Sequence, residues 1–313
     1  MQYFTNEKHY NTLNNYYRAR FGTKVMKIAL NGGFSCPNRD GTLSTKGCLF
    51  CSEKGSGDFA GNPVESIKNQ YKQVKTMMNK KWKDGLYIAY FQAFSNTYGP
   101  IEQLKTIYET ALSLDNDIIG LNIGTRADCF NDDIYDLLDS LNHQTYLTVE
   151  LGLQSMHDES LAYINRGHNR DQFTKTVRAL RQRGIDVVVH IINGLPGETK
   201  EMMFQTIDYI NQLDIQGIKI HMLYVIKNTP LASIYLNDPF DILSLAEYTD
   251  ITVHQIRKLN PNIIIHRVTG DPPKNLLITP EWTLKKFVVQ NNIDKQMRKQ
   301  GFYQGDLYHP LFK

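Results

Sequence analysis

Three cysteines lie close together in the first sixth of the chain, at positions 36, 48 and 51. Thiolates are preferred ligands of zinc and of iron–sulfur clusters. A closed structural zinc site needs four protein ligands, so three cysteines leave such a site one ligand short. A 4Fe-4S cluster held by Cys36, Cys48 and Cys51 would instead leave one iron open to a substrate or cofactor. We therefore expect chemistry at this loop, and a zinc site completed by a histidine is the alternative.

The composition is that of a globular protein with a mild positive charge. The chain has 313 residues, of which 41% are hydrophobic and 21% charged, and its formal net charge is +3. This length suits one α/β barrel or two smaller lobes, and the charge permits a nucleic-acid partner without requiring one. The N-terminus is too polar for a signal peptide, and the most apolar run, residues 187–192, is too short to span a membrane. We expect a cytoplasmic protein without a membrane partner, and the oligomeric state stays open.

Short β-branched runs alternate with amphipathic stretches along the chain, which predicts a parallel sheet covered by helices. Strands are expected at residues 25–30, 86–91, 118–123, 146–151, 187–192 and 217–223, with a further one at 263–266. Helices are expected at residues 64–79, 100–114, 132–141, 171–183, 199–213 and 241–258. Because no repeat or interdomain linker is evident, one barrel-like α/β domain with terminal extensions is the simplest interpretation.

Polar residues gather directly after the expected strands. The segments are the cysteine loop, 92–97 (QAFSNT), 124–129 (GTRADC), 150–155 (ELGLQS), 190–198 (HIINGLPGE) and 219–224 (KIHMLY). Parallel α/β folds build their sites at the carboxyl ends of strands, so these segments should meet at one shared mouth.

Several segments together resemble the radical S-adenosylmethionine (radical SAM) enzymes. They are residues 31–41 (NGGFSCPNRDG), 90–98 (YFQAFSNTY), 150–154 (ELGLQ) and 267–271 (RVTGD). The usual motif has three and then two residues between its cysteines, whereas this chain has eleven and then two, as in some branches that include the elongator catalytic subunits. Within the superfamily the chain resembles a bacterial branch associated with modification of the wobble uridine of tRNA.

The resemblance implies a fold and a reaction. The fold would be a partial (β/α)6 TIM-like barrel at residues 24–270 with a cluster loop at 32–52, an N-terminal extension at 1–23 and a C-terminal extension at 271–313. A 4Fe-4S cluster would transfer one electron to the sulfonium of S-adenosylmethionine (SAM), and the resulting 5′-deoxyadenosyl radical would abstract hydrogen from the substrate. The expected reaction converts the carboxymethylaminomethyl group of uridine 34 to aminomethyl, with tRNA and an electron donor such as flavodoxin or ferredoxin as partners. A small-molecule substrate is one alternative, and a zinc-stabilised RNA-binding adaptor is another.

The resemblance also suggests residues that hold the cofactors. The positions are Gln92, Asn96, Arg126, Glu150, Gln154, Arg166, His190, Asn193, Gly194 and Leu223, with Cys36, Cys48 and Cys51 as the cluster ligands. A guanidinium suits a carboxylate, while Glu and Gln side chains can bind ribose hydroxyls. A buried ion pair or a hydrogen bond between strand ends is the alternative for Arg126, Glu150, Gln154 and Arg166. The usual Gly-Gly-Glu of the second strand is replaced by residues 92–97, so the residue that binds the methionyl amine stays open.

Two further features allow two interpretations each. Cys129 follows the third expected strand, but a free cysteine is more often a small buried hydrophobe. The stretch 16–21 (YYRARF) has the aromatic and basic side chains that stack on bases and contact phosphates, and it equally fits an amphipathic helix packed on the barrel.

Overall fold

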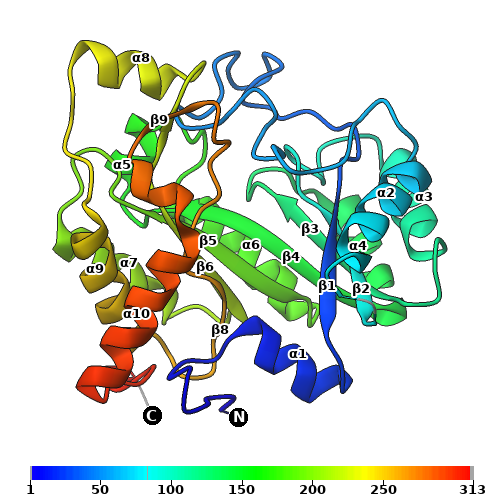
Figure 1. The fold of residues 1–313 in the computed structure, drawn as a ribbon. Helices are drawn as coiled ribbons and strands as arrows, with labels where there is room; N and C mark the ends of the chain where they lie inside the picture. The colour runs from blue at the N-terminus through cyan, green and yellow to red at the C-terminus, as the bar shows by residue number, and fades with distance from the viewer. Residues whose placement is uncertain (1, 83, 311–313) are drawn as a thin grey trace.

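A computed structural model describes residues 2–82 and 84–310. Its centre is one parallel sheet with the strand order β1-β2-β3-β4-β5-β6-β8, in which each strand pairs in parallel with the next. The strands are β1 (Val25–Leu30), β2 (Leu86–Phe91), β3 (Ile118–Thr125), β4 (Tyr146–Gln154), β5 (Asp186–Asn193), β6 (Gly217–Met222) and β8 (Ile264–Arg267). Figure 1 shows a curled sheet with helices around it, which is the predicted partial barrel.

Helices connect the strands at all six expected places. The helices of the structure are α1 (Leu13–Phe21), α2 (Ile67–Asn79), α3 (Ile101–Leu112), α4 (Asp132–Gln144), α5 (Asp158–Tyr163), α6 (Arg170–Gln182), α7 (Lys200–Ile210), α8 (Pro230–Asn237), α9 (Leu245–Lys258), α10 (Lys286–Gln300) and the 3-10 helix η1 (Glu281–Leu284). Several begin at a Ser, Thr or Asn whose side chain accepts a hydrogen bond from the backbone amide three residues later, as Asn131 and Asn169 do. Such N-caps satisfy amides that lack a partner inside the helix.

The short elements near the mouth were not expected from the sequence. They are α5, α8 and an antiparallel pair formed by β7 (Val225–Ile226) and β9 (Leu277–Thr279). A two-residue strand and a six-residue helix are too short to produce a recognisable period, which is why the pattern of apolar residues did not indicate them.

The main apolar core lies between the sheet and the helices. Strand side chains such as Leu121, Val149 and Leu151 are fully buried in it. Side chains on a strand alternate between its two faces, so Glu150 lies on the opposite face from Val149 and Leu151 and points into the lumen. The sheet therefore separates an apolar layer outside from a polar lumen inside.

The two ends of the chain meet at the edge of the sheet beside β8. The backbone amide of Ile265 donates to the carbonyl of Asn11 at 2.7 Å, and the Tyr10 hydroxyl donates to Asp294 of α10 at 2.9 Å. The N-terminal segment thus continues the sheet beyond its last strand. The division into extensions at residues 1–23 and 271–313 and a barrel at 24–270 stays a prediction.

Helix α1 packs against the barrel as the second interpretation of residues 16–21 requires. Tyr17 is buried and, like Phe21, contacts the ring of Tyr146. Tyr146 is the first residue of β4, so α1 lies at the amino ends of the strands, away from the mouth. None of the helices in residues 2–82 and 84–310 is long and apolar enough to cross a membrane.

The apolar layer makes a stability prediction. Replacing Leu121 with Ala should lower the free energy of unfolding by about 2–5 kcal/mol, because its buried side chain leaves a cavity between β3 and the helices. Leu236→Ala on α8 is the matched control, because this side chain is 67% exposed. The control should change the free energy of unfolding by less than about 0.5 kcal/mol. Chemical denaturation followed by circular dichroism measures both, and equal effects would place Leu121 outside the core.

Candidate active site

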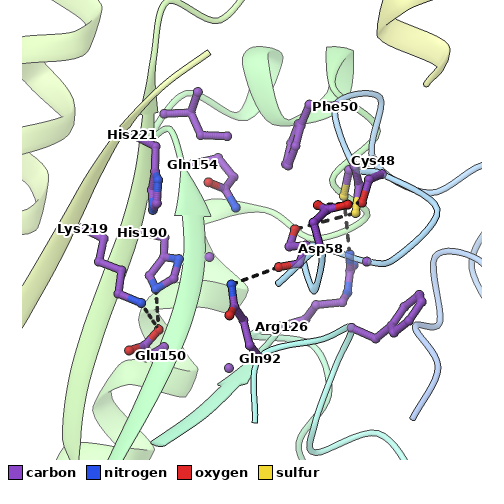
Figure 2. Close-up of a pocket in the computed structure, with 18 of the residues that line it drawn as sticks. Cys48, Phe50, Asp58, Gln92, Arg126, Glu150, Gln154, His190, Lys219 and His221 are labelled. Atoms are coloured by element: carbon purple, nitrogen blue, oxygen red, sulfur yellow. Dashed lines mark hydrogen bonds and ion pairs between the residues drawn. The ribbon is translucent and has the colours of Figure 1, made fainter. Parts of the chain in front are cut away.

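The carboxyl ends of the strands open into one pocket beneath the cysteine loop. The side chains that line it come from this loop and from β2, β3, β4, β5, β6 and the end of β8. Cys36, Cys48 and Cys51 all line it. Figure 2 shows Cys48 at its upper edge, while Glu150 and Lys219 lie deeper in the lumen. Figure 2 shows the two groups facing the same cavity. The shared mouth expected from the sequence is therefore present.

The cysteine loop is fixed by side chains that bind its backbone. The Arg39 guanidinium donates to the carbonyls of Cys51 and Ser52 at 2.8 and 2.7 Å. The Asn165 amide donates to the carbonyl of Gly47 at 2.7 Å, and the Asn38 amide donates in turn to the carbonyl of Asn165 at 2.6 Å. The Arg39 contacts tie the two ends of the loop together, and the asparagine contacts join the loop to the segment after α5.

Positive and amide groups surround the sulfur of Cys48. The amide nitrogen of Asn38 and a guanidinium nitrogen of Arg166 each lie 3.6 Å from Sγ, and Arg126 Nη1 lies at 3.9 Å. Arg126 is held by the Asp128 carboxylate at 2.7 and 2.9 Å. Burial lowers the pKa of Arg126, but the hydrogen bond and charge of Asp128 outweigh it and raise the pKa above its ordinary value. This surrounding suits a thiolate or another anion.

The donor set fits a 4Fe-4S cluster. Three thiols share one edge of the pocket, and burial raises the pKa of the Cys51 thiol, which a metal would overcome because coordination deprotonates a thiol. Among the described residues no three His, Cys, Asp or Glu side chains converge as the ligands of a single metal ion. A cubane places three irons at three separate corners, so its cysteines need not meet at one point.

One buried polar atom beside this edge lacks a partner. Arg166 Nε is buried and has no hydrogen-bond partner among the described residues, whereas the Ser95 hydroxyl lies beside the Cys129 thiol. Buried polar groups are almost always satisfied, so an exception in a residue that lines a cavity points to a ligand.

Gln154 has an unusual backbone conformation at the end of β4. Its φ is 74°, a value in the left-handed region that side-chain-bearing residues adopt at a cost of about 1–3 kcal/mol. Figure 2 shows its side chain at the cavity, between the lumen and the cysteine loop. Strain of this kind gathers where a side chain must be aimed at a ligand.

The lumen is organised by the fully buried carboxylate of Glu150. It accepts hydrogen bonds from Lys27 Nζ at 2.9 Å, Lys219 Nζ at 2.5 Å, His190 Nε2 at 2.9 Å, Tyr90 Oη at 2.7 Å and the side-chain amide of Asn122. For Glu150 the structure thus contains the buried ion pairs that the sequence offered as an alternative. Its role in holding ribose stays a prediction.

The pKa values in this network follow from burial and the shared charges. Burial favours a raised pKa for Glu150, but Lys219 and Lys27 outweigh it and hold that pKa well below its usual value. Burial lowers the pKa of Lys219 to about 8, against the effect of Glu150. Burial and the charge of Lys219 lower the pKa of His190 to about 4. At neutral pH the network holds an ionised carboxylate, a largely protonated lysine and a neutral histidine.

Most of the residues suggested from the sequence line the pocket. They are Cys36, Cys48, Cys51, Gln92, Arg126, Glu150, Gln154, Arg166, His190 and Leu223. The other three predicted residues do not line the pocket and contact other parts of the protein. Asn96 donates to the carbonyls of Phe91, Ala93 and Gly124, the Asn193 amide pairs with Gln255 of α9, and Gly194 lies against Leu243.

Sequence reasoning did not assign a site role to several other lining residues. Asp58 and Phe59 follow the cysteine loop in a stretch without a regular pattern, so no signal indicated them. Arg267 is different, because it ends β8, and the rule that sites form at the carboxyl ends of strands could have found it. His221, which the sequence placed at a strand end, also lines the pocket.

Comparisons with known proteins agree with this geometry. The family model described as "Radical SAM superfamily" matches residues 38–210. A second model, described as "Radical_SAM C-terminal domain", matches residues 215–299. Uncharacterized protein YtqA of Bacillus subtilis is 47% identical over 99% of this chain and 96% of its own length. The tRNA uridine(34) acetyltransferase of Methanocaldococcus jannaschii is 26% identical over 64% of this chain and 36% of its own length.

A solved structure shares the fold. The archaeal Elp3 of Methanocaldococcus infernus has a TM-score of 0.65 and 17% identity, and the match covers 90% of this chain and 64% of that one. The superfamily match decides against a zinc-stabilised adaptor. The chain therefore belongs to the radical SAM superfamily, and it is an enzyme whose cofactors are a 4Fe-4S cluster and SAM.

Proposed function

We propose that this enzyme acts on tRNA and converts the carboxymethylaminomethyl group of wobble uridine 34 to aminomethyl. The observation that carries the proposal is a polar, cationic lumen directly beneath the cysteine loop, in a chain related to a tRNA uridine(34) acetyltransferase. A substituent with a carboxylate and an amine fits such a lumen better than an apolar substrate does.

The pocket residues have separate roles in this proposal. Cys36, Cys48 and Cys51 would hold the cluster, and with SAM bound the two cofactors would supply the radical that abstracts hydrogen from the substrate. Abstraction from the methylene between the nitrogen and the carboxylate, return of one electron to the cluster or its electron carrier, and hydrolysis of the resulting imine would leave the aminomethyl group and release glyoxylate. Arg166, whose buried Nε lacks a partner among the described residues, binds a polar atom of SAM. Gln154 adds a hydrogen bond from its strained position, and Arg126 supports the charge at Cys48.

The mouth offers one feature suited to a nucleotide. Phe59 lines the pocket at its rim, and its side chain is 61% exposed. An enzyme that acts on a base must take it out of its stack, and an exposed aromatic ring is a surface on which an extruded base can stack. In this proposal the protein works in the cytoplasm and receives its electron from a flavodoxin or ferredoxin.

A gain-of-function experiment tests the substrate. The gene is introduced into a bacterial strain whose tRNA retains the carboxymethylaminomethyl group, and the nucleosides of the purified tRNA are quantified by mass spectrometry. Aminomethyl uridine should appear as the carboxymethylaminomethyl form declines, and a Cys48→Ala copy should produce none. An unchanged profile with active protein present would favour a small-molecule substrate.

The ligand assignment is tested on purified protein. Cys36→Ala, Cys48→Ala and Cys51→Ala should each abolish 5′-deoxyadenosine formation from SAM, because an incompletely held cluster cannot present its open iron. Cys129→Ala is the control, since burial raises the pKa of this thiol to about 12 and the side chain packs as a small apolar group. The control should retain about four irons per chain after anaerobic reconstitution. A Cys→Ala variant at position 36, 48 or 51 that still cleaves SAM would remove that thiol from the ligand set.

A further inference from the structure

Three cationic or imidazole side chains form a row across the last strands of the sheet. His190 on β5 pairs in register with Lys219 on β6, and Lys219 pairs in register with Arg267 on β8. All three line the pocket, so they face the lumen at one depth. His221 also lines the pocket, two residues further along β6.

The side chains of this row differ in how many of their hydrogen-bond donors have a partner. Lys219 donates to Glu150 and lies 3.2 Å from the Tyr90 hydroxyl, and His190 is bound to the same carboxylate. Arg267 has five N–H donors, and in the described part of the chain its hydrogen bond and ion pair go to Asp271 alone. Its side chain is 30% exposed, so the remaining donors are accessible from the cavity.

The charges that line the cavity favour an incoming anion. Five lining side chains are cationic, namely Arg39, Arg126, Arg166, Lys219 and Arg267, and three are carboxylates, namely Asp58, Glu150 and Asp271. In a partly desolvated lumen this excess attracts a carboxylate and disfavours additional net positive charge.

We propose that Arg267 binds the carboxylate of the substrate's carboxymethylaminomethyl group and makes the enzyme prefer this substrate to its aminomethyl product. The inference rests on the proposed function. A guanidinium presents two parallel N–H donors that match a carboxylate, which a lysine does not. Substrate and product both carry an amine, and the product lacks the carboxylate. The product therefore cannot accept the Arg267 hydrogen bonds and has one more unit of net positive charge, so the same cations that hold the substrate favour release of the product.

A binding experiment tests this role without turnover. Two anticodon stem-loops are compared, one with carboxymethylaminomethyl uridine at position 34 and one with the neutral carbamoylmethyl amide in its place. Anaerobic fluorescence anisotropy measures their affinities for the reconstituted protein with SAM and without reductant. The wild-type protein should prefer the carboxylate by about 10- to 100-fold, the range expected for a hydrogen bond to a charged group.

The variants isolate Arg267 from the general charge of the lumen. Arg267→Gln should bind both stem-loops equally and as weakly as wild type binds the amide, while Arg267→Lys should recover part of the preference. Lys286→Gln is the matched control, because Lys286 pairs with the same Asp271 but does not line the pocket, and it should keep the wild-type preference. Iron content and circular dichroism establish that each variant is folded.

Two outcomes would overturn the inference. One is a folded Arg267→Gln variant with the wild-type preference, and the other is a wild-type protein that converts the modified tRNA but binds both stem-loops equally. Failure of the proposed function is distinguishable, since a wild-type protein that cleaves SAM would then convert neither the stem-loop nor the tRNA.

Discussion

One buried carboxylate connects most of the barrel. Glu150 lies on β4 and receives hydrogen bonds from side chains on β1, β2, β3, β5 and β6. Removing an ionised carboxylate from water costs several kcal/mol unless charges and hydrogen bonds compensate it. Here they come from five different strands, so the carboxylate is stable only when the sheet is curled around it. The polar lumen and the curvature of the sheet therefore depend on each other.

The cysteine loop depends on a second set of contacts at the mouth. Arg39, Asn38 and Asn165 hold its backbone, and Arg126 and Arg166 place positive charge beside Cys48. Arg126 and Arg166 are themselves fixed by Asp128 and by the backbone carbonyls of Arg166 and Gly152, so the charge beside Cys48 is held in place. In the proposed mechanism the cysteine loop thus carries the chemistry at the upper edge, and the last strands of the sheet carry the recognition at the lower edge.

The charges at the lower edge favour binding of the proposed substrate over binding of its product. The excess of cations among the lining side chains distinguishes a substituent with a carboxylate from one with an amine alone. An enzyme gains from such a difference because the product leaves a site that still attracts the next substrate. The exposed ring of Phe59 at the rim is independent of this charge and concerns the base itself.

The sequence by itself determined the alternation of strands and helices, the three-cysteine loop and the place of the site at the strand ends. These features are local, because a strand period, an N-cap or a cysteine spacing is written in neighbouring residues. Only the tertiary structure decided which strand ends share the cavity. It showed that Asn96 and Asn193 bind the protein itself, that Glu150 is paired with lysines from β1 and β6, and that Arg267, paired with Asp271, lines the same cavity. Residues 27, 150, 219 and 267 are far apart in the chain, and only the closing of the sheet brings their charges together, so no local pattern could indicate which of them pair.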